Sequence, residues 1–146
     1  MRILAGREGC LIAIDEVGRG ALAGPVTVGA VAIDVRTHPQ PSGIDDSKAV
    51  TPRRRQALVP DIFRWARGMS ISHVSAQRID AVGLSAALGE AARGALHALS
   101  HLGVRCVLVD GIFDFVSPVT PGWETHVLEK ADSSCASVAE IGRAHV

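Results

Sequence analysis

Acidic side chains come directly after two apolar runs of this sequence. Asp15 and Glu16 follow the run at residues 10–14, and Asp110 follows the run at residues 104–109. Reactive groups commonly collect where strands end, and carboxylate oxygens are hard ligands that suit Mg²⁺ or Mn²⁺ better than zinc or copper. Two such ions about 3.5–4 Å apart can activate a water molecule and stabilise a leaving oxygen. The acids therefore point to phosphate chemistry, although exposed acids at strand ends are also common without a metal.

The spacing of the acids limits how they can meet. Neighbouring residues of a regular strand point to opposite faces. We therefore expect Asp15 and Glu16 to converge only if the strand bends or breaks beside them, as Gly18 and Gly20 would allow. A further acid, Asp132, stands at an expected helix entrance, where a carboxylate more often caps the helix than binds a metal.

Residues 18–24 read GRGALAG, a glycine pattern that follows an expected strand. One interpretation is a dinucleotide-binding loop, in which the glycines open a helix whose N-terminus faces a pyrophosphate. Pro25 and the valine-rich run that follows it favour a second strand there instead. The other interpretation, which we favour, is that residues 18–20 let the backbone and the Arg19 guanidinium approach a nucleic-acid strand closely.

The elements that position these residues follow from apolar periodicity and from capping signals. Strands are expected at residues 10–14, 26–33, 69–74 and 104–109. Helices are expected after the N-caps Thr51 and Ser75 and over residues 84–99. This alternation predicts an α/β domain in which helices pack on a mixed sheet.

The composition predicts one compact domain without a strong electrostatic bias. The chain has 146 residues, 47% hydrophobic content and a formal net charge of zero, so charge alone gives no argument for a polyanionic partner. Its three cysteines form no CxxC pair, and His97 and His101, the two of its six histidines that stand at helical spacing, lie on an expected solvated helix face. We therefore expect neither a disulfide framework nor a zinc site. No run is long and apolar enough to span a bilayer. We expect a cytoplasmic monomer with no membrane partner.

Four ordered motifs together resemble the ribonuclease HII family, and the last of them is most similar to its actinobacterial branch. They are IDEVGRGALAGPV at residues 14–26, DDSK at 45–48, LVDG at 108–111 and KADSSCASVA at 130–139. The first motif is highly specific, whereas VDG or DSK alone would mean little. The resemblance extends from about residue 5 to residue 139 and implies a ribonuclease H-like mixed β-sheet flanked by α-helices.

The resemblance also implies a set of site residues. Those that it assigns to a catalytic centre binding Mg²⁺ or Mn²⁺ are Asp15, Glu16, Asp110 and Asp132. Those that it assigns to substrate binding are Gly18, Arg19, Gly20, Ser47 and Lys48. Residues 18–20 would lie near the ribose 2′-hydroxyl of an RNA–DNA junction, and Ser47 and Lys48 would lie near substrate phosphates.

The reaction that the resemblance implies is hydrolysis of the phosphodiester 5′ of a ribonucleotide embedded in duplex DNA, or within the RNA strand of an RNA–DNA hybrid. Two-metal-ion catalysis would leave a 3′-hydroxyl and a 5′-phosphate. The expected partners are therefore RNA–DNA hybrids and ribonucleotide-containing duplex DNA, and the reaction would begin ribonucleotide excision repair.

The last seven residues depart from the family pattern. After residue 139 that pattern continues as an Ala/Ser-rich helix and a basic region, whereas this chain reads EIGRAHV and stops. We expect residues 1–139 to be a catalytic domain that lacks its C-terminal helices, and residues 140–146 to be a non-native tail read from a sequencing adapter. Two alternatives stay open: an inactive truncated fragment that binds only metal or hybrid duplex, and a dinucleotide-binding module.

Overall fold

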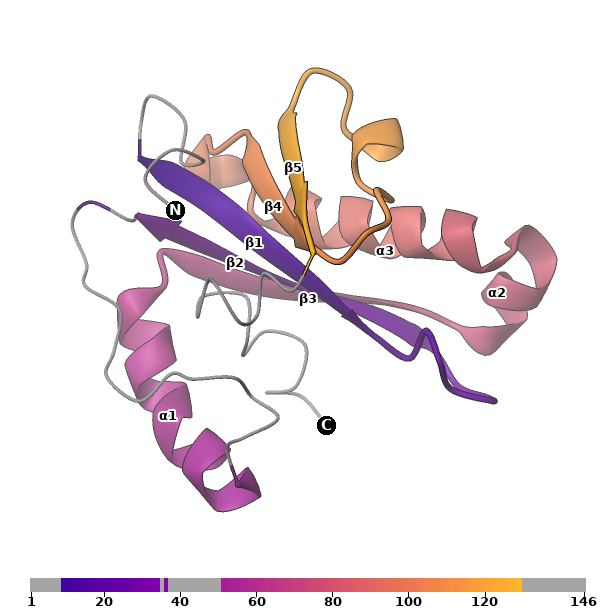
Figure 1. The fold of residues 1–146 in the computed structure, drawn as a ribbon, viewed down its shortest axis with the longest axis horizontal. Coiled ribbons are helices and arrows are strands. Elements are labelled where there is room, and N and C mark those ends of the chain that lie inside the picture. The colour runs from indigo at the N-terminus through magenta and orange to yellow at the C-terminus, as the bar shows by residue number, and fades with distance from the viewer. Residues whose placement is uncertain (1–8, 35, 37–50, 130–146) are drawn as a thin grey trace.

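The computed structural model describes residues 9–34, 36 and 51–129, which form a mixed sheet with helices on both faces (Figure 1). The strands are β1 (Cys10–Val17), β2 (Val26–Asp34), β3 (Gly68–Val74), β4 (Cys106–Asp110) and β5 (Glu124–Leu128). Their order is β3-β2-β1-β4-β5; the β3–β2 and β2–β1 pairs are antiparallel, and the β1–β4 and β4–β5 pairs are parallel. The helices are α1 (Pro52–Trp65), α2 (Ala76–Val82) and α3 (Leu84–Ala98), with 3-10 turns at Ser100–Leu102 and Ser117–Val119.

The predicted α/β architecture is confirmed, and so are the signals that start two helices. Thr51 Oγ1 accepts a hydrogen bond from the Arg54 N–H at 3.4 Å, and Ser75 Oγ accepts one from the Arg78 N–H at 3.3 Å. These oxygens satisfy backbone donors that every helix start leaves unpaired. After α3, Gly103 takes a left-handed conformation, with φ 71°, which ends the helical segment before β4.

β1 is buried on both faces because each face of the sheet carries its own apolar cluster. Ile12 and Ile14 pack with the buried side of α3, whereas Leu11 and Ala13 pack with Trp65 at the end of α1. Successive strand residues alternate between faces, so even-numbered residues of β1 face α3 and odd-numbered residues face α1. This alternation decides where each acid at the end of β1 points.

α3 approaches the sheet closely because small residues line its buried side. Ala91 and Ala95 are fully buried, and a Cβ added at Gly94 would lie 2.4 Å from Ser72 Oγ on β3. Ser70 Oγ on the same strand donates a hydrogen bond to the Ala95 carbonyl at 2.7 Å. The helix therefore braces β3, the antiparallel strand at this edge of the sheet.

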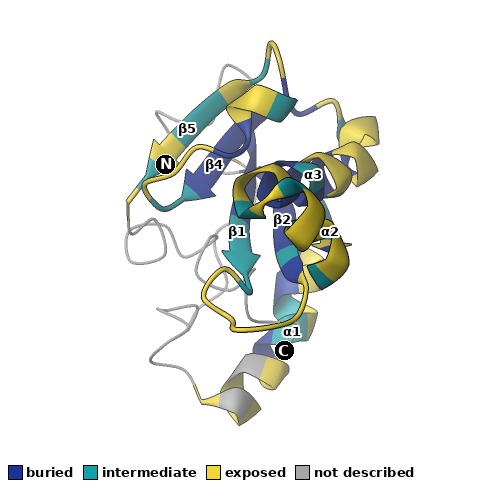
Figure 2. Cartoon of the chain, turned by 90° about the vertical axis from the view of Figure 1, so that its right-hand side faces the viewer, coloured by how far each residue is buried: buried dark blue, intermediate teal, exposed yellow. Residues whose placement is uncertain are grey.

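Two features differ from the expectation based on sequence. β1 extends to Val17, because its pairing with β2 continues to Val17 and Thr27. The sequence does not predict β5, because it is a five-residue edge strand whose side chains are at most partly buried. Figure 2 shows that β5 is partly buried or exposed, whereas β4 is mostly buried. Among the helices of the described residues, none is long and apolar enough to cross a membrane.

Candidate active site

Asp15 and Asp110 come together at the same end of two adjacent parallel strands. The register pairs Ala13 with Leu108 and Ile14 with Val109, so Asp15 and Asp110 occupy the next positions. Ala13 and Leu108 belong to the apolar cluster on the α1 face. Strand alternation therefore places the half-buried Asp15 and Asp110 on that same face, two residues further along.

Glu16 faces the opposite side of the sheet at the same strand end. Its antiparallel partner is Val28, which belongs to the cluster that packs against α3. The break that the glycines favour comes only after Val17, so Asp15 and Glu16 keep the normal alternation of a strand. The two neighbours are nevertheless linked, because Asp15 Oδ1 accepts a hydrogen bond from the Glu16 N–H at 2.8 Å.

The Glu16 carboxylate keeps one oxygen without a donor. Its Oε1 lies 3.5 Å from Arg19 Nη1, whereas Oε2 is buried and has no hydrogen-bond partner among the residues that the structure describes. Burial raises the pKa of Glu16 above 4.5, the negative charge of Asp110 adds to that rise, and Arg19 opposes it. A buried carboxylate oxygen is costly unless something positive or a donor meets it. The hard oxygen donors of this site therefore fit a Mg²⁺ or Mn²⁺ ion.

The turn between β1 and β2 uses its two predicted glycines differently. Gly18 has φ 98°, and a Cβ there would lie 2.5 Å from the carbonyl oxygen of Pro25, so only glycine fits without strain. A Cβ at Gly20 would meet nothing within 4 Å. Gly18 thus builds the turn, and Gly20 leaves its backbone open to a ligand.

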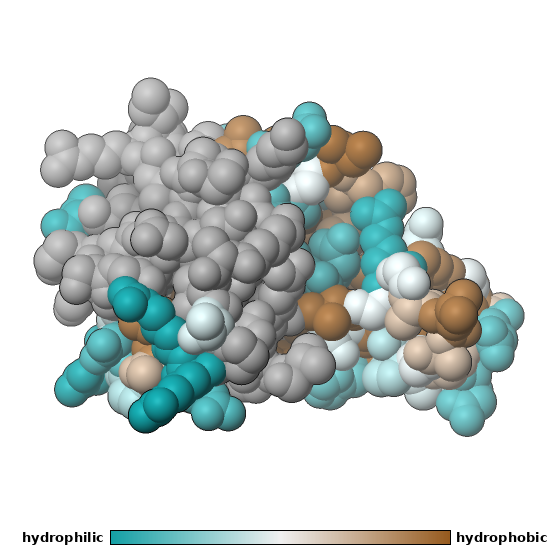
Figure 3. Space-filling view, turned by 60° about the horizontal axis from the view of Figure 1, so that its bottom comes forward, coloured by the Kyte–Doolittle hydropathy of each residue, from teal (hydrophilic) through white to brown (hydrophobic). Residues whose placement is uncertain are grey.

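Arg19 connects this turn to the segment that follows β4. Besides its ion pair with Glu16, its Cζ lies 5.5 Å from the centre of the Phe113 ring. Phe113 is 40% exposed, and Leu22 and Ile112 are more exposed still. Figure 3 shows exposed hydrophobic residues at the right-hand end of the molecule, the end where the turn lies in Figure 1.

Sequence reasoning missed Ile112 and Phe113 as candidates. The signal available was an apolar pair directly after the strand-end residues Asp110 and Gly111, where solvent-facing loops usually carry polar side chains. The nearness of Phe113 to Arg19 depends on the pairing of β1 with β4, which the sequence pattern does not specify.

Three of the predicted site residues, Ser47, Lys48 and Asp132, lie outside the described residues, as does the predicted tail at residues 140–146. The dinucleotide-binding interpretation is wrong. It requires a helix directly after Gly20, and the chain instead makes a turn and enters β2.

The model of the ribonuclease HII family matches residues 12–140. This chain belongs to the ribonuclease HII family. The ribonuclease HII of Streptomyces avermitilis is 42% identical over 129 residues, which are 86% of this chain and 52% of that protein. The ribonuclease HII of Rhizobium meliloti is 40% identical over 127 residues, which are 86% of this chain and 55% of that protein. The chain therefore spans about half the length of the curated relatives it matches.

Solved structures confirm the predicted ribonuclease H-like fold. The ribonuclease H2 from Pyrococcus horikoshii OT3 is 25% identical with a TM-score of 0.65, and the match covers 90% of this chain and 68% of that one. Bst-RNase HIII, solved in complex with Mn²⁺, is 20% identical with a TM-score of 0.68, and the match covers 97% of this chain and 54% of that one. The described sheet and helices thus form a known fold, that of the ribonuclease H-like proteins.

The geometry of the turn predicts that its two glycines differ in their effect on stability. We expect Gly18→Ala to lower the free energy of unfolding by about 1–3 kcal/mol, because alanine there meets both a positive φ and the Pro25 carbonyl. The matched control Gly20→Ala should change it by less than about 0.5 kcal/mol. Urea unfolding of the two variants measures this, and equal losses would contradict the assigned roles.

The raised pKa of Glu16 predicts a pH-dependent stability in the metal-free chain. The contribution of Glu16 to the free energy of unfolding is fully present below its ordinary pKa of 4.5. It is lost as the pH rises through the raised pKa that Glu16 has in the folded chain. Glu16→Gln stays neutral and should remove that loss, so the variant should gain stability relative to the parent chain as the pH rises above 4.5.

Glu90→Gln is the control of opposite sign, because its hydrogen bond with Arg78 lowers the pKa of Glu90. That variant should lose stability relative to the parent chain as the pH rises. Unfolding free energies across the pH range test both expectations, and the same trend in both variants would contradict the environment assigned to Glu16.

Proposed function

We propose that this chain forms the catalytic centre of an endonuclease that hydrolyses the phosphodiester 5′ of a ribonucleotide in duplex DNA, or within the RNA strand of an RNA–DNA hybrid. The observation that carries the proposal is the pairing of Asp15 with Asp110 at the ends of adjacent parallel strands. Glu16, whose Oε2 has no donor among the described residues, stands at the same end. Membership of the ribonuclease HII family supports this choice of reaction.

The residues proposed to hold Mg²⁺ or Mn²⁺ are Asp15 and Asp110, which share the α1 face, and Asp132 from outside the described residues. Glu16 points to the other face at the same strand end, so it would reach the ion only around that end. The carboxylates at this end of the sheet repel one another, and the negative charge of Asp110 raises the pKa of Glu16. A cation bound there would reduce this electrostatic repulsion. The chemistry that bound ions supply is activation of a water molecule and stabilisation of the leaving 3′ oxygen, which yields a 3′-hydroxyl and a 5′-phosphate.

The turn after β1 is proposed to read the sugar of the substrate. The open backbone at Gly20 would approach the ribose 2′-hydroxyl, the group that distinguishes RNA from DNA. The Arg19 side chain is 46% exposed and lies between Glu16 and Phe113, from where its guanidinium can contact a phosphate. Ser47 and Lys48 would add further phosphate contacts.

The exposed ring of Phe113 is proposed to stack on the face of a nucleotide beside the scissile bond. Such stacking is tolerant of sequence and contributes about 1–3 kcal/mol per base. Because the chain has a formal net charge of zero, its affinity for nucleic acid depends on local contacts of this kind. We place the activity in a cytoplasmic monomer, with residues 1–139 as its catalytic domain and ribonucleotide excision repair as its role.

A second candidate function is the binding of metal or hybrid duplex without cleavage. Asp15 and Asp110, with Glu16 at the same strand end, supply oxygen donors for a cation, whereas the reaction needs every proposed ligand correctly placed. A displacement of about 1 Å in a catalytic group can cost about a hundredfold in rate. The two functions are separated by measuring cleavage and binding on the same substrate.

We expect Asp15→Asn and Asp110→Asn each to lower the rate of cleavage by more than about a hundredfold, because each removes a charged metal ligand. The assay is strand cleavage of a duplex with one embedded ribonucleotide in the presence of Mn²⁺ or Mg²⁺. The matched control Asp61→Asn changes a partly exposed acid on α1 and should leave the rate unchanged.

The product position tests the reaction itself. A nick immediately 5′ of the ribonucleotide, absent from an all-DNA duplex, supports the endonuclease. Binding of the duplex without any nick selects the second candidate function. Cleavage that persists in Asp15→Asn would overturn the assignment of the metal centre.

A further inference from the structure

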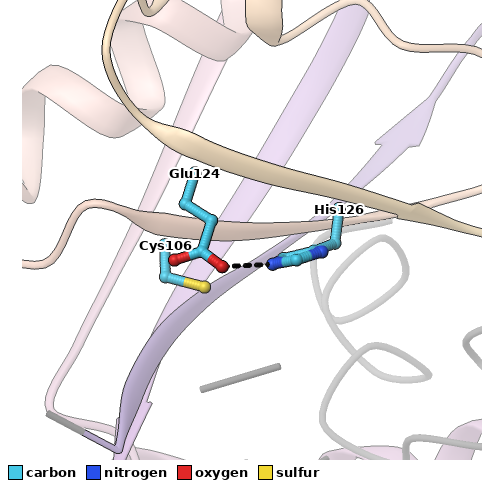
Figure 4. A group of neighbouring side chains, drawn as sticks. All are labelled: Cys106, Glu124 and His126. Carbon is cyan, nitrogen blue, oxygen red and sulfur yellow. Dashed lines mark hydrogen bonds and ion pairs between the residues drawn. The ribbon is translucent and has the colours of Figure 1, made fainter. Parts of the chain in front are cut away.

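Three side chains that do not belong to the proposed carboxylate centre meet between β4 and β5. Cys106 lies on β4, and Glu124 and His126 lie on β5. Each offers one ligand atom, and these atoms all lie within 4.8 Å of one another. Figure 4 shows the three side chains directed toward a common point, with the His126 ring joined to the Glu124 carboxylate.

We propose that Cys106, Glu124 and His126 form a second metal site, which binds a thiophilic divalent ion such as Zn²⁺. The site does not depend on the proposed nuclease activity, because it uses none of the residues assigned to that reaction. It would fasten the edge strand β5 to β4.

The strand register explains why these side chains share one face. In the parallel β4–β5 pair, Cys106 is paired with Glu124, and Leu108 is paired with His126. Cys106 and Leu108 both belong to the apolar cluster on the α1 face, so their partners Glu124 and His126 point to that face as well. The backbone of a paired sheet therefore fixes all three donors.

Neighbouring contacts hold the start of β5 in place beside Cys106. The Glu124 N–H donates a hydrogen bond to the Arg105 carbonyl at 2.9 Å. The Arg105 guanidinium stacks over the Trp123 ring, with 4.5 Å between Cζ and the ring centre. Donors on rigid elements lose little entropy when an ion binds, which favours a site that exists before binding.

The donor set matches zinc better than magnesium. Zinc in proteins is bound by Cys sulfur at about 2.3 Å, His nitrogen at about 2.0–2.1 Å and carboxylate oxygen at about 2.0–2.2 Å. His126 Nε2 and Glu124 Oε1 are already 2.9 Å apart. These two side chains are 31% and 57% exposed, so both can rotate toward a shared ion, and a water molecule can fill a fourth position.

The electrostatics of the cluster also favour a cation. Burial, followed by the negative charge of Glu124, raises the pKa of the Cys106 thiol to about 11. A divalent ion would offset both causes, since it stabilises the thiolate and neutralises the nearby carboxylate. Binding of a divalent ion would therefore lower the electrostatic cost of the Cys106 thiolate and of the neighbouring Glu124 carboxylate together.

The proposed zinc site is separate from the carboxylate centre. Cys106 precedes Asp110 by four residues on the same face of β4, which corresponds to about 13 Å along a strand. The two sites also differ in chemistry, because one offers only oxygen donors and the other includes sulfur and nitrogen. A hard ion such as Mg²⁺ should therefore not compete for the second site.

The test titrates Co²⁺, as a spectroscopic substitute for Zn²⁺, into the reduced, metal-free full chain in excess Mg²⁺. We expect one ion per chain at this site, with thiolate-to-cobalt charge-transfer absorption that Zn²⁺ abolishes by displacement. Cys106→Ser should remove this absorption and weaken binding by about a hundredfold or more. Cys10→Ser and Cys135→Ser are the matched controls and should leave the absorption unchanged.

His126→Gln is a second variant that tests the site if Cys106→Ser fails to fold. We expect it to fold because His126 is partly exposed on an edge strand. It should weaken Zn²⁺ binding by about tenfold or more, whereas His101→Gln at an exposed position should not. The proposal is overturned if the folded parent chain binds no Co²⁺ or Zn²⁺, or if the charge-transfer absorption survives in Cys106→Ser. It is also overturned if Cys10→Ser or Cys135→Ser abolishes that absorption.

Discussion

β1 and β4 run parallel at the centre of the sheet, and their register forces Asp15 and Asp110 to the same end and the same face. Two carboxylates held together in a half-buried position repel each other, and Glu16 adds a third charge at that end. The fold tolerates this repulsion because β1 is anchored by apolar residues on both faces. A bound cation would turn the same repulsion into affinity, so the central strand pair links stability to the proposed function.

The segments around this strand end depend on the same pairing. Gly18 turns the chain directly after β1, and Arg19 then reaches both Glu16 and Phe113. Phe113 follows β4, so the contact between the two segments exists only because β1 and β4 are neighbours. On the other side of β4, the parallel β5 brings Glu124 and His126 to Cys106. Both proposed metal sites therefore depend on the strands that pair with β4.

Local signals in the sequence predict local structure well. Thr51 and Ser75 start helices as expected, because capping depends on a few consecutive residues. The buried strands carry apolar runs, and Asp15 and Asp110 follow two of them, but their meeting depends on the pairing of β1 with β4, which the apolar pattern does not specify. The sequence does not predict β5 or the cluster around Cys106, because a partly exposed edge strand lacks an apolar run and its register is set by long-range pairing. Spacing along the chain is therefore a poor guide to ligands that lie on paired strands.

The most direct test of the central claim is anomalous X-ray diffraction from crystals of the full chain soaked with Mn²⁺. The account predicts an anomalous peak at the end of β1 and β4, within coordination distance of the carboxylates of Asp15 and Asp110. The same data from Asp15→Asn crystals should show a weaker peak or none. A well-ordered site in which Mn²⁺ binds elsewhere, while these two carboxylates contact only protein and water, would contradict the account.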